Sequence, residues 1–310
     1  MQKKGTVYII TGPTAVGKSS VAIEFAKKIN GEIINCDSVQ LYKYMDIGSA
    51  KPSEDELRSV KHHLYSVVDP DYNMTAATYQ KLVFACIDNV ISRGKIPVVC
   101  GGTGLYINSI MYKMDFAGET DDGTRRKELE KMAEENGKEY MHHYLAGIDP
   151  KTAEKIHPNN IRKVIRAIEA FELGDGIKTL NDCEPNSDYD FRFFALRMDR
   201  ELLYSRINNR VNELMNKGLL NEVKFLVKFG FKDAPALKSI GYKELIEYLD
   251  GEVDLDTAID NIKKNTRHYA KRQYTWFNRY DNVNWLDVDA FDEPAKIADQ
   301  IIDATLSTGV

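Results

Sequence analysis

The sequence predicts an α/β fold, in which helices flank a parallel β-sheet and a helical subdomain is inserted into the chain. An apolar run at residues 7–11, a glycine-rich turn and an amphipathic segment at residues 21–29 follow one another directly. Two more short apolar runs, at residues 32–37 and 97–100, are separated by a segment whose apolar residues have helical spacing. Alternation of short strands with helices is typical of a parallel sheet.

The turn after the first expected strand has a phosphate-binding sequence. It reads Gly12, Pro13, Thr14, Ala15, Val16, Gly17, Lys18 and Ser19. A strand, a glycine-rich turn and a helix start place successive backbone N–H groups around one anion, while Lys18 reaches the terminal phosphates and Ser19 is placed to bind Mg²⁺. An ordinary glycine turn is the alternative, but a chance match rarely has a strand before it and a helix after it. We therefore expect this P-loop to bind a diphosphate or a triphosphate.

The next elements bring further side chains to the same edge of the sheet. The second expected strand, residues 32–37, ends in the Asp37 carboxylate, and the strand at residues 97–100 runs into a glycine-rich turn that contains Thr103. Between them a helix is expected at residues 78–92. Ligands of parallel sheets lie beyond the carboxyl ends of the strands, so Asp37 and Thr103 are expected near the P-loop.

The composition changes in the middle of the chain, where charged residues follow a helical spacing between glycine-rich breaks. We expect an inserted helical subdomain at residues 119–186 and a core formed by residues 1–118 and 187–310. In the second part of the core a strand is expected at residues 193–196, followed by a long helical run at residues 200–228.

The overall composition limits the possible classes of protein. The chain has 310 residues with 43% hydrophobic content, which is enough for a full core and a second, smaller domain. No apolar run approaches the roughly 20 residues that span a bilayer, and no cleavable signal sequence is visible, so we expect a cytoplasmic protein without membrane spans. The four cysteines are far apart and form no C-x-x-C pair, which disfavours a zinc site or a disulfide framework.

The charge distribution is uneven. The net charge of −5 argues against indiscriminate binding of nucleic acid by the whole surface. Residues 261–280, however, contain lysines and arginines interleaved with aromatic residues and no acidic residue. Cations for phosphates and flat rings for splayed bases are typical of single-stranded RNA binding. A solvated basic helix is an equally good interpretation of this segment alone.

Six short segments, in order along the chain, resemble the signatures of one enzyme family. They read GPTAVGKS at residues 12–19, DSVQLY at 37–42 followed by MDIGSAKP at 45–52, GGTGLY at 101–106, HPNN at 157–160, IGYKE at 240–244, and KRQYTWF at 271–277. In this order and spacing they resemble bacterial tRNA dimethylallyltransferases, the IPP transferase family, over nearly the whole chain. The resemblance implies transfer of a dimethylallyl group from dimethylallyl diphosphate to N6 of the adenosine immediately 3′ of the anticodon in tRNA.

The resemblance also implies catalytic roles for three residues. Asp37 is the candidate general base for the exocyclic amine; by itself it would be taken for a carboxylate that orders water around Mg²⁺. Thr103 offers a hydroxyl to the bridging oxygen of the diphosphate; by itself it would be a turn residue. Arg210, one turn beyond Arg206, matches the family arginine that contacts the diphosphate; by itself it would be an arginine on a helix surface.

The implied partners are dimethylallyl diphosphate, the tRNA anticodon stem-loop and the cofactor Mg²⁺ at Ser19. Beside the base, the flipped adenosine is expected to contact Ser38, Val39, Gln40 and Leu41. The anticodon arm is expected to contact Arg126 (or its neighbour Arg125), Arg162, Lys163, Arg166, Lys238, Gly241, Tyr242, Lys243, Arg267, Lys271, Arg272 and Gln273. We expect a monomer.

Three alternatives stay open. A prenyltransferase of free adenine nucleotides would share the P-loop and the base, but a mononucleotide has no anticodon arm that would need a basic segment and an insert. A P-loop kinase of a small metabolite would need only Lys18, Ser19 and Asp37. A nucleotide-gated RNA-binding protein would bind RNA in an ATP-dependent way without group transfer.

Overall fold

The computed structural model describes residues 3–114, 124–172 and 183–307. The chain divides into two compact units, Met1–Met111 with Asn186–Val310, and Tyr112–Pro185. The expected start of the insert, residue 119, lies outside the described residues.

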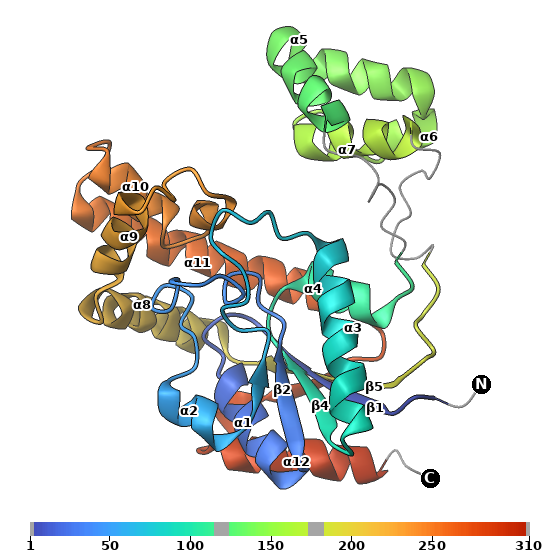
Figure 1. Cartoon of the computed structure of the whole chain (residues 1–310), viewed down its shortest axis with the longest axis vertical. Coiled ribbons are helices and arrows are strands. Elements are labelled where there is room, and N and C mark those ends of the chain that lie inside the picture. Colours follow the sequence, from blue (N-terminus) through green and yellow to red (C-terminus); the bar gives the residue numbers. More distant parts are fainter. Residues whose placement is uncertain (1–2, 115–123, 173–182, 308–310) are drawn as a thin grey trace. The chain divides into compact units, whose positions relative to one another are not determined.

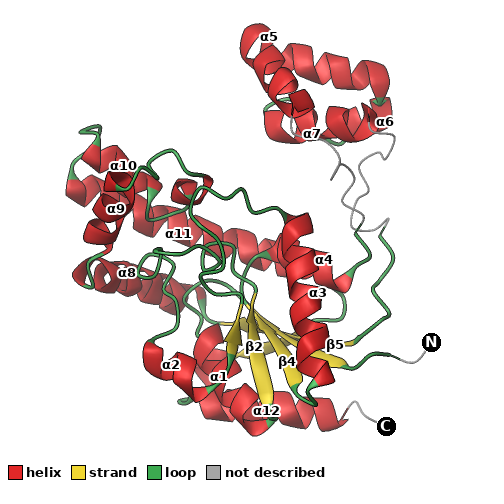
Figure 2. Ribbon diagram, in the orientation of Figure 1, coloured by secondary structure: helices red, strands yellow, loops and turns green. Residues whose placement is uncertain are grey.

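A six-stranded sheet forms the centre of the first unit (Figure 2). The strands are β1 (Thr6–Thr11), β2 (Gly31–Asn35), β3 (His62–His63), β4 (Ile96–Cys100), β5 (Asp190–Arg197) and β6 (Asn284–Asp287). Their order is β3-β2-β4-β1-β5-β6, and all neighbouring pairs are parallel. The predicted α/β class with a parallel sheet is therefore confirmed.

The central position of β1 places the P-loop in the middle of the sheet edge. Ile10 of β1 lies opposite Cys100 of β4 on one side and Phe194 of β5 on the other. Alternate residues of β1 face opposite sides of the sheet, and Tyr8 and Ile10 belong to the hydrophobic core that α1 shares. The carboxyl ends of β1, β2 and β4 therefore lie side by side at one edge of the sheet.

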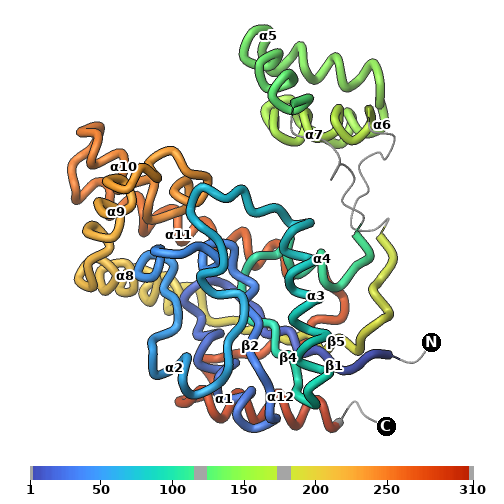
Figure 3. Tube along the Cα trace, in the orientation of Figure 1, coloured from blue at the N-terminus to red at the C-terminus, as the bar shows by residue number. Residues whose placement is uncertain are grey.

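Helices cover both faces of this sheet and extend from it (Figure 1). In the first unit they are α1 (Lys18–Lys28), α2 (Glu54–Ser59), α3 (Ala76–Ser92), α4 (Gly104–Met111), α8 (Arg200–Asn216), α9 (Leu219–Lys228), α10 (Lys243–Leu249), α11 (Leu255–Phe277) and α12 (Pro294–Ser307). Helix α1 packs on α12, and α3 packs on α4 and on β4. The late helix α11, labelled in Figure 3, approaches the P-loop, because Gln273 of α11 accepts a hydrogen bond from the Thr14 amide. Among the described residues no helix is both long and apolar enough to cross a bilayer.

The helical run expected at residues 200–228 is two helices rather than one. Helix α8 ends at Asn216, and α9 begins at Leu219. Gly218 between them has a φ of 102°, a left-handed conformation that breaks the helical hydrogen-bond ladder and that glycine adopts without a steric penalty. The break gives α9 a direction different from that of α8. The first turn of α9 therefore contacts residues 46–48 through Glu222.

The second unit is helical. It contains α5 (Thr124–Ile148), α6 (Pro150–Ala153) and α7 (Ile161–Glu172). Leu129, Met141 and Leu145 of α5 form a core with Val164 and Ile168 of α7, all fully buried. Helix α5 is bent at Gly137, whose φ is 80°.

Candidate active site

The P-loop adopts the conformation that its sequence predicts. Gly12 has a φ of 138°, and a Cβ there would lie 2.5 Å from the backbone oxygen of Leu196, so only glycine fits. Gly17, with a φ of 105°, is the N-cap of α1 and supplies no side-chain cap. The first amides of α1 are therefore left for another acceptor, which is the arrangement of an anion site at a helix N-terminus.

Lys18 is folded back over the loop. Its Nζ donates a hydrogen bond to the Pro13 carbonyl at 2.8 Å. Burial lowers the pKa of Lys18 from 10.5 to about 8, and the nearby Asp37 carboxylate offsets only part of that effect. A bound polyanion would restore the charge of this ammonium.

Asp37 and Thr103 meet where β2 and β4 end. The Asp37 carboxylate accepts a hydrogen bond from the Val39 amide at 2.9 Å, which fixes its direction. The Thr103 hydroxyl accepts one from the Ser38 amide at 3.0 Å, and the Thr103 amide donates to the Cys36 carbonyl at 3.1 Å. The structure thus brings together two of the predicted catalytic side chains from strands that are far apart in sequence.

Arg210 of α8 belongs to the same electrostatic neighbourhood. Burial lowers the pKa of Arg210, while Asp37 and Glu213 raise it. Arg206, one turn earlier, also approaches the P-loop: its Nη2 lies 3.9 Å from the position of a Cβ built on Gly17. Arg206 is a residue for which the sequence analysis assigned no role, although its spacing of four residues from Arg210 places both on one helix face.

Gln273 of α11 joins the P-loop to the end of β4. Its Oε1 accepts a hydrogen bond from the Thr14 amide at 2.8 Å, and its Nε2 donates to the Gly102 carbonyl at 2.9 Å. The side chain is only 4% exposed. A Cβ on Gly102 would lie 2.2 Å from Nε2, so glycine is required for this approach. The predicted tRNA contact of Gln273 stays a prediction; its observed partners are the P-loop and the turn before Thr103.

The residues expected beside the adenosine form the turn after Asp37. Ser38, Val39 and Gln40 are partly exposed, whereas Leu41 is fully buried in the core. The Gln40 side chain donates from Nε2 to the carbonyls of Ser49 (3.0 Å) and Ala50 (3.2 Å). The turn is therefore braced by a second loop, which the sequence analysis did not connect with it.

The cationic residues expected to contact tRNA differ in exposure. Three of them, Arg267, Lys271 and Arg272, lie on helix α11, and together with Lys264 of the same basic segment we call them the α11 cations. All except Arg267 are exposed, and Arg267 donates to Asn208 Oδ1 at 2.6 Å. The exposed guanidinium of Arg272 also lies 5.7 Å from the ring centre of Tyr269. Exposed cations beside an aromatic ring are compatible with RNA phosphates and bases.

The remaining predicted contacts lie on two other segments. Lys238 and Lys243 are exposed, whereas Gly241 and Tyr242 are buried. In the second unit, Arg162, Lys163 and Arg166 are exposed along α7. The alternative positions Arg125 and Arg126 are both engaged in ion pairs, with Glu172 and Glu169 respectively.

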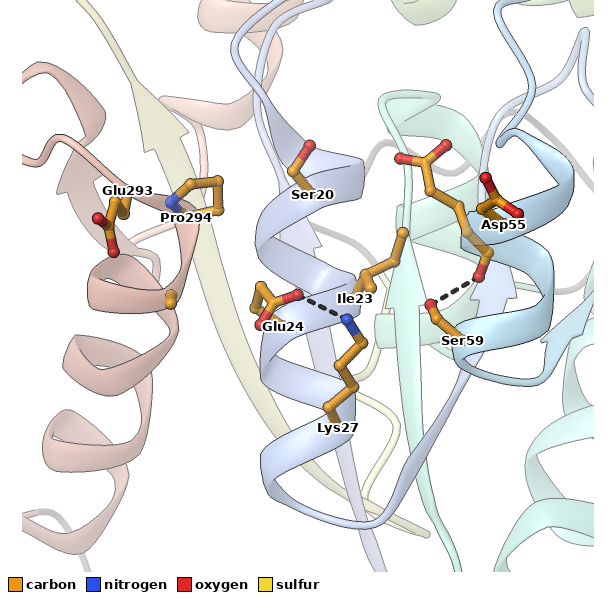
Figure 4. A pocket seen from close by; sticks show the side chains of 10 residues that line it. Ser20, Ile23, Glu24, Lys27, Asp55, Ser59, Glu293 and Pro294 are labelled. Atoms are coloured by element: carbon orange, nitrogen blue, oxygen red, sulfur yellow. Dashed lines mark hydrogen bonds and ion pairs between the residues drawn. The ribbon is translucent and has the colours of Figure 1, made fainter.

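A surface pocket between α1, α2 and the start of α12 lies outside this constellation (Figure 4). The carboxylates of Glu24, Asp55, Glu56 and Glu293 line it, and Lys27, which also lines it, pairs with Glu24 at 2.8 Å. Because these carboxylates outnumber the single lysine, the charge of the lining repels diphosphates and RNA phosphates. We therefore assign neither substrate to this pocket.

Comparison with known proteins gives a consistent result. The family model described as IPP transferase matches residues 40–280. The tRNA dimethylallyltransferase of Acetivibrio thermocellus is 48% identical over 295 residues, which cover 94% of each chain. The crystal structure of a tRNA isopentenylpyrophosphate transferase from Bacillus halodurans is similar with a TM-score of 0.72 at 40% identity, covering 97% of this chain and 96% of the other. A eukaryotic dimethylallyltransferase acting on tRNA is similar with a TM-score of 0.83 at 28% identity, covering 99% of this chain and 80% of the other.

Proposed function

The chain belongs to the IPP transferase family, and from that premise we propose that it transfers a dimethylallyl group from dimethylallyl diphosphate to N6 of the adenosine immediately 3′ of the anticodon in tRNA. One observation supports this proposal most strongly: Lys18 and Arg210, two partly buried cations, both interact electrostatically with the Asp37 carboxylate. Two cations suit a departing diphosphate, and a carboxylate that interacts with both of them suits the proton of the incoming amine.

The chief chemical task is to stabilise the leaving group. As the bond between the allylic carbon and the diphosphate oxygen breaks, negative charge builds on the diphosphate. The P-loop amides, Lys18 and Arg210 would hold that charge, and the Thr103 hydroxyl would donate to the bridging oxygen. Lys18 and Thr103 are already held by contacts with the Pro13 carbonyl and the Ser38 amide, which limits the reorganisation that they need at the moment of reaction.

The proton of the adenosine amine needs an acceptor. The N6–carbon bond forms as the carbon–oxygen bond breaks, and the amine becomes acidic only then. The Asp37 carboxylate, held in place by the Val39 amide, would take this proton. The diphosphate and the modified tRNA are the products.

The residues present fit a Mg²⁺ ion that is shared with the diphosphate. Mg²⁺ is usually bound by one or two protein oxygens, substrate phosphates and waters. The described residues contain no group of three or more His, Cys, Asp or Glu side chains that could hold a metal alone. The Ser19 hydroxyl, exposed at the first turn of α1, would therefore be the protein ligand, and the ion would neutralise diphosphate charge.

The nucleic-acid partner is proposed to be the anticodon stem-loop, held by the α11 cations and by the exposed cations of α7. We propose that the protein works on tRNA in the cytoplasm as a monomer. ATP would at most compete for the P-loop.

The experiment that tests the proposal is incubation of the purified protein with tRNA, dimethylallyl diphosphate and Mg²⁺. We expect a mass gain of one dimethylallyl group on a single adenosine 3′ of the anticodon, with release of diphosphate. AMP replaces tRNA in a parallel reaction, and ATP replaces dimethylallyl diphosphate in another. Modification of AMP but not of tRNA, or ATP hydrolysis coupled to phosphorylation, would contradict the proposal.

A further inference from the structure

The loop that braces Gln40 is itself bound to one carboxylate from a distant helix. Glu222, in the first turn of α9, accepts hydrogen bonds from three successive backbone amides: Asp46 (2.8 Å), Ile47 (2.7 Å) and Gly48 (2.9 Å). These amides have no other acceptor among the hydrogen bonds of the described residues. Converging amides of this kind form a binding site for an anion, which here is a side chain of the same chain.

Tyr242 completes the set of donors to this carboxylate. Its hydroxyl donates to Glu222 Oε1 at 2.8 Å, and its ring is fully buried. A Cβ on Gly48 would lie 2.5 Å from the Tyr242 hydroxyl, so the loop passes as close to the ring as a backbone can. Each Glu222 oxygen therefore has two donors, and the carboxylate has little freedom to move.

The loop is held in a backbone conformation that needs such support. Ala50 has a φ of 48° and Tyr44 a φ of 63°, values that residues with a Cβ rarely adopt unless neighbouring contacts enforce them. Lys51, at the end of the loop, donates to Asp46 Oδ1 and to Ser66 Oγ, each at 2.7 Å. The strained Ala50 is one of the two residues whose carbonyls hold the Gln40 amide.

We propose that Glu222 is a positioning residue for the nucleoside side of the active site, acting through residues 46–50 on Gln40. The path is continuous: the Glu222 carboxylate holds three amides of the loop, and the next two carbonyls hold the Gln40 side chain. Gln40 follows Asp37 by three residues, so its displacement also disturbs the turn that presents the base. The inference rests on the proposed function in one respect, namely that Gln40 lies beside the adenosine.

Glu222→Gln is the informative substitution. It keeps the size of the side chain but replaces one acceptor oxygen by an NH₂ group, which faces donors whichever way the amide is turned. Tyr242→Phe removes one donor and leaves the three amide contacts in place, so it is expected to have the smaller effect. Glu252→Gln is the matched control, because Glu252 is exposed, lies in the same unit and loses the same charge.

Hydrogen exchange measures the protection of the loop amides independently of enzymatic activity. In Glu222→Gln the amides of residues 46–48 are expected to exchange roughly tenfold faster or more, since they lose a charged acceptor. In the Glu252→Gln control they are expected to exchange at the wild-type rate. Unchanged exchange in Glu222→Gln would overturn the inference at its first step, whatever the enzyme modifies.

Enzyme kinetics then tests whether Glu222 acts through Gln40 on the modification of the nucleoside. Glu222→Gln is expected to lower kcat for tRNA modification roughly 10- to 100-fold through misplacement of the base, with wild-type affinity for dimethylallyl diphosphate. In a Gln40→Ala background the same substitution is expected to cost less than about twofold more, because the two changes break one path. Multiplicative losses in the double variant would overturn the path through Gln40. Absence of transfer by the wild-type protein would contradict the proposed function instead, while the exchange experiment would still decide whether Glu222 holds the loop.

Discussion

Binding of dimethylallyl diphosphate should change the protonation of Lys18, and the size of the change can be worked out. Burial lowers the pKa of Lys18 to about 8 in the free protein. A bound diphosphate places negative charge at the ammonium and raises this pKa again. Binding must therefore take up a proton wherever free Lys18 is partly neutral, and affinity must fall as the pH rises.

The expected uptake follows from the free-state pKa of about 8. In the free protein the Lys18 amine is deprotonated in roughly 0.1 of the molecules at pH 7, 0.5 at pH 8 and 0.9 at pH 9. If Lys18 is fully charged in the complex, these fractions are the numbers of protons taken up per bound ligand. Integrated over this range, the affinity for dimethylallyl diphosphate should fall about tenfold between pH 7 and pH 9. The ligand contributes little, because the last pKa of a phosphate ester is about 6.

Calorimetric titrations in buffers of different ionisation enthalpy measure proton uptake directly. Lys18→Met, which keeps the apolar stem and removes the titrating group, is the control and should bind weakly with no uptake between pH 7 and pH 9. Lys28→Met should retain the wild-type uptake, because Lys28 lies at the far end of α1 and pairs with Asp299. A wild-type uptake that stays near zero at pH 9 would show that diphosphate binding does not restore the charge of Lys18.

Four other outcomes are expected. Asp37→Ala should reduce kcat roughly 10²- to 10⁴-fold with diphosphate affinity nearly intact, and retained turnover would remove it from the mechanism. Gln273→Ala should weaken diphosphate binding roughly tenfold in calorimetry, and Gln273→Glu further, since a carboxylate cannot donate to Gly102; unchanged binding by both would contradict the bridge. Hydrogen bonds from Arg93 and, to a smaller extent, His63 lower the pKa of Glu32 from 4.5 to about 2. This carboxylate therefore stabilises the fold above pH 4.5 and loses its contribution as the pH falls toward 2. In denaturant unfolding, Glu32→Gln should lower the free energy of unfolding by about 2 kcal/mol at pH 7 and should weaken the fall of stability between pH 4.5 and pH 2. Neutralising two α11 cations should lower the salt slope of tRNA affinity by about two units without changing the modified adenosine, and an unchanged slope would make them merely a solvated face.

The sequence predicted the conformation of the P-loop because this loop depends on local patterns. A glycine-rich turn between a strand and a helix has few possible conformations, so the P-loop and Lys18 could be placed from consecutive residues. Asp37 and Thr103 followed from one general property of parallel sheets, that the carboxyl ends of strands share an edge. The order of the strands was not needed for this prediction.

The bracing contacts could not be predicted in the same way. Gln273 bonds to Thr14 across 259 positions of sequence, and both of its partners are backbone atoms, which every residue possesses. Glu222 is one carboxylate among many, and its partners are again backbone amides. The break at Gly218 did have a signal, a glycine inside a helical pattern, and that break is what directs the first turn of α9 toward residues 46–48.

Helix α11 has exposed cations on one side and packs against the P-loop and the sheet core on another. Lys264, Lys271 and Arg272 are exposed, whereas Gln273 is buried against the P-loop and Ala270 belongs to the sheet core. The side chains of adjacent residues 272 and 273 point in directions about 100° apart on a helix, so one can face solvent while the next is buried in the core. A rigid helix cannot shift on one face without shifting on the other. If the proposed function holds, RNA bound by the exposed cations would therefore stay in fixed register with a diphosphate in the P-loop, which is the geometric requirement for transfer of a group from one to the other.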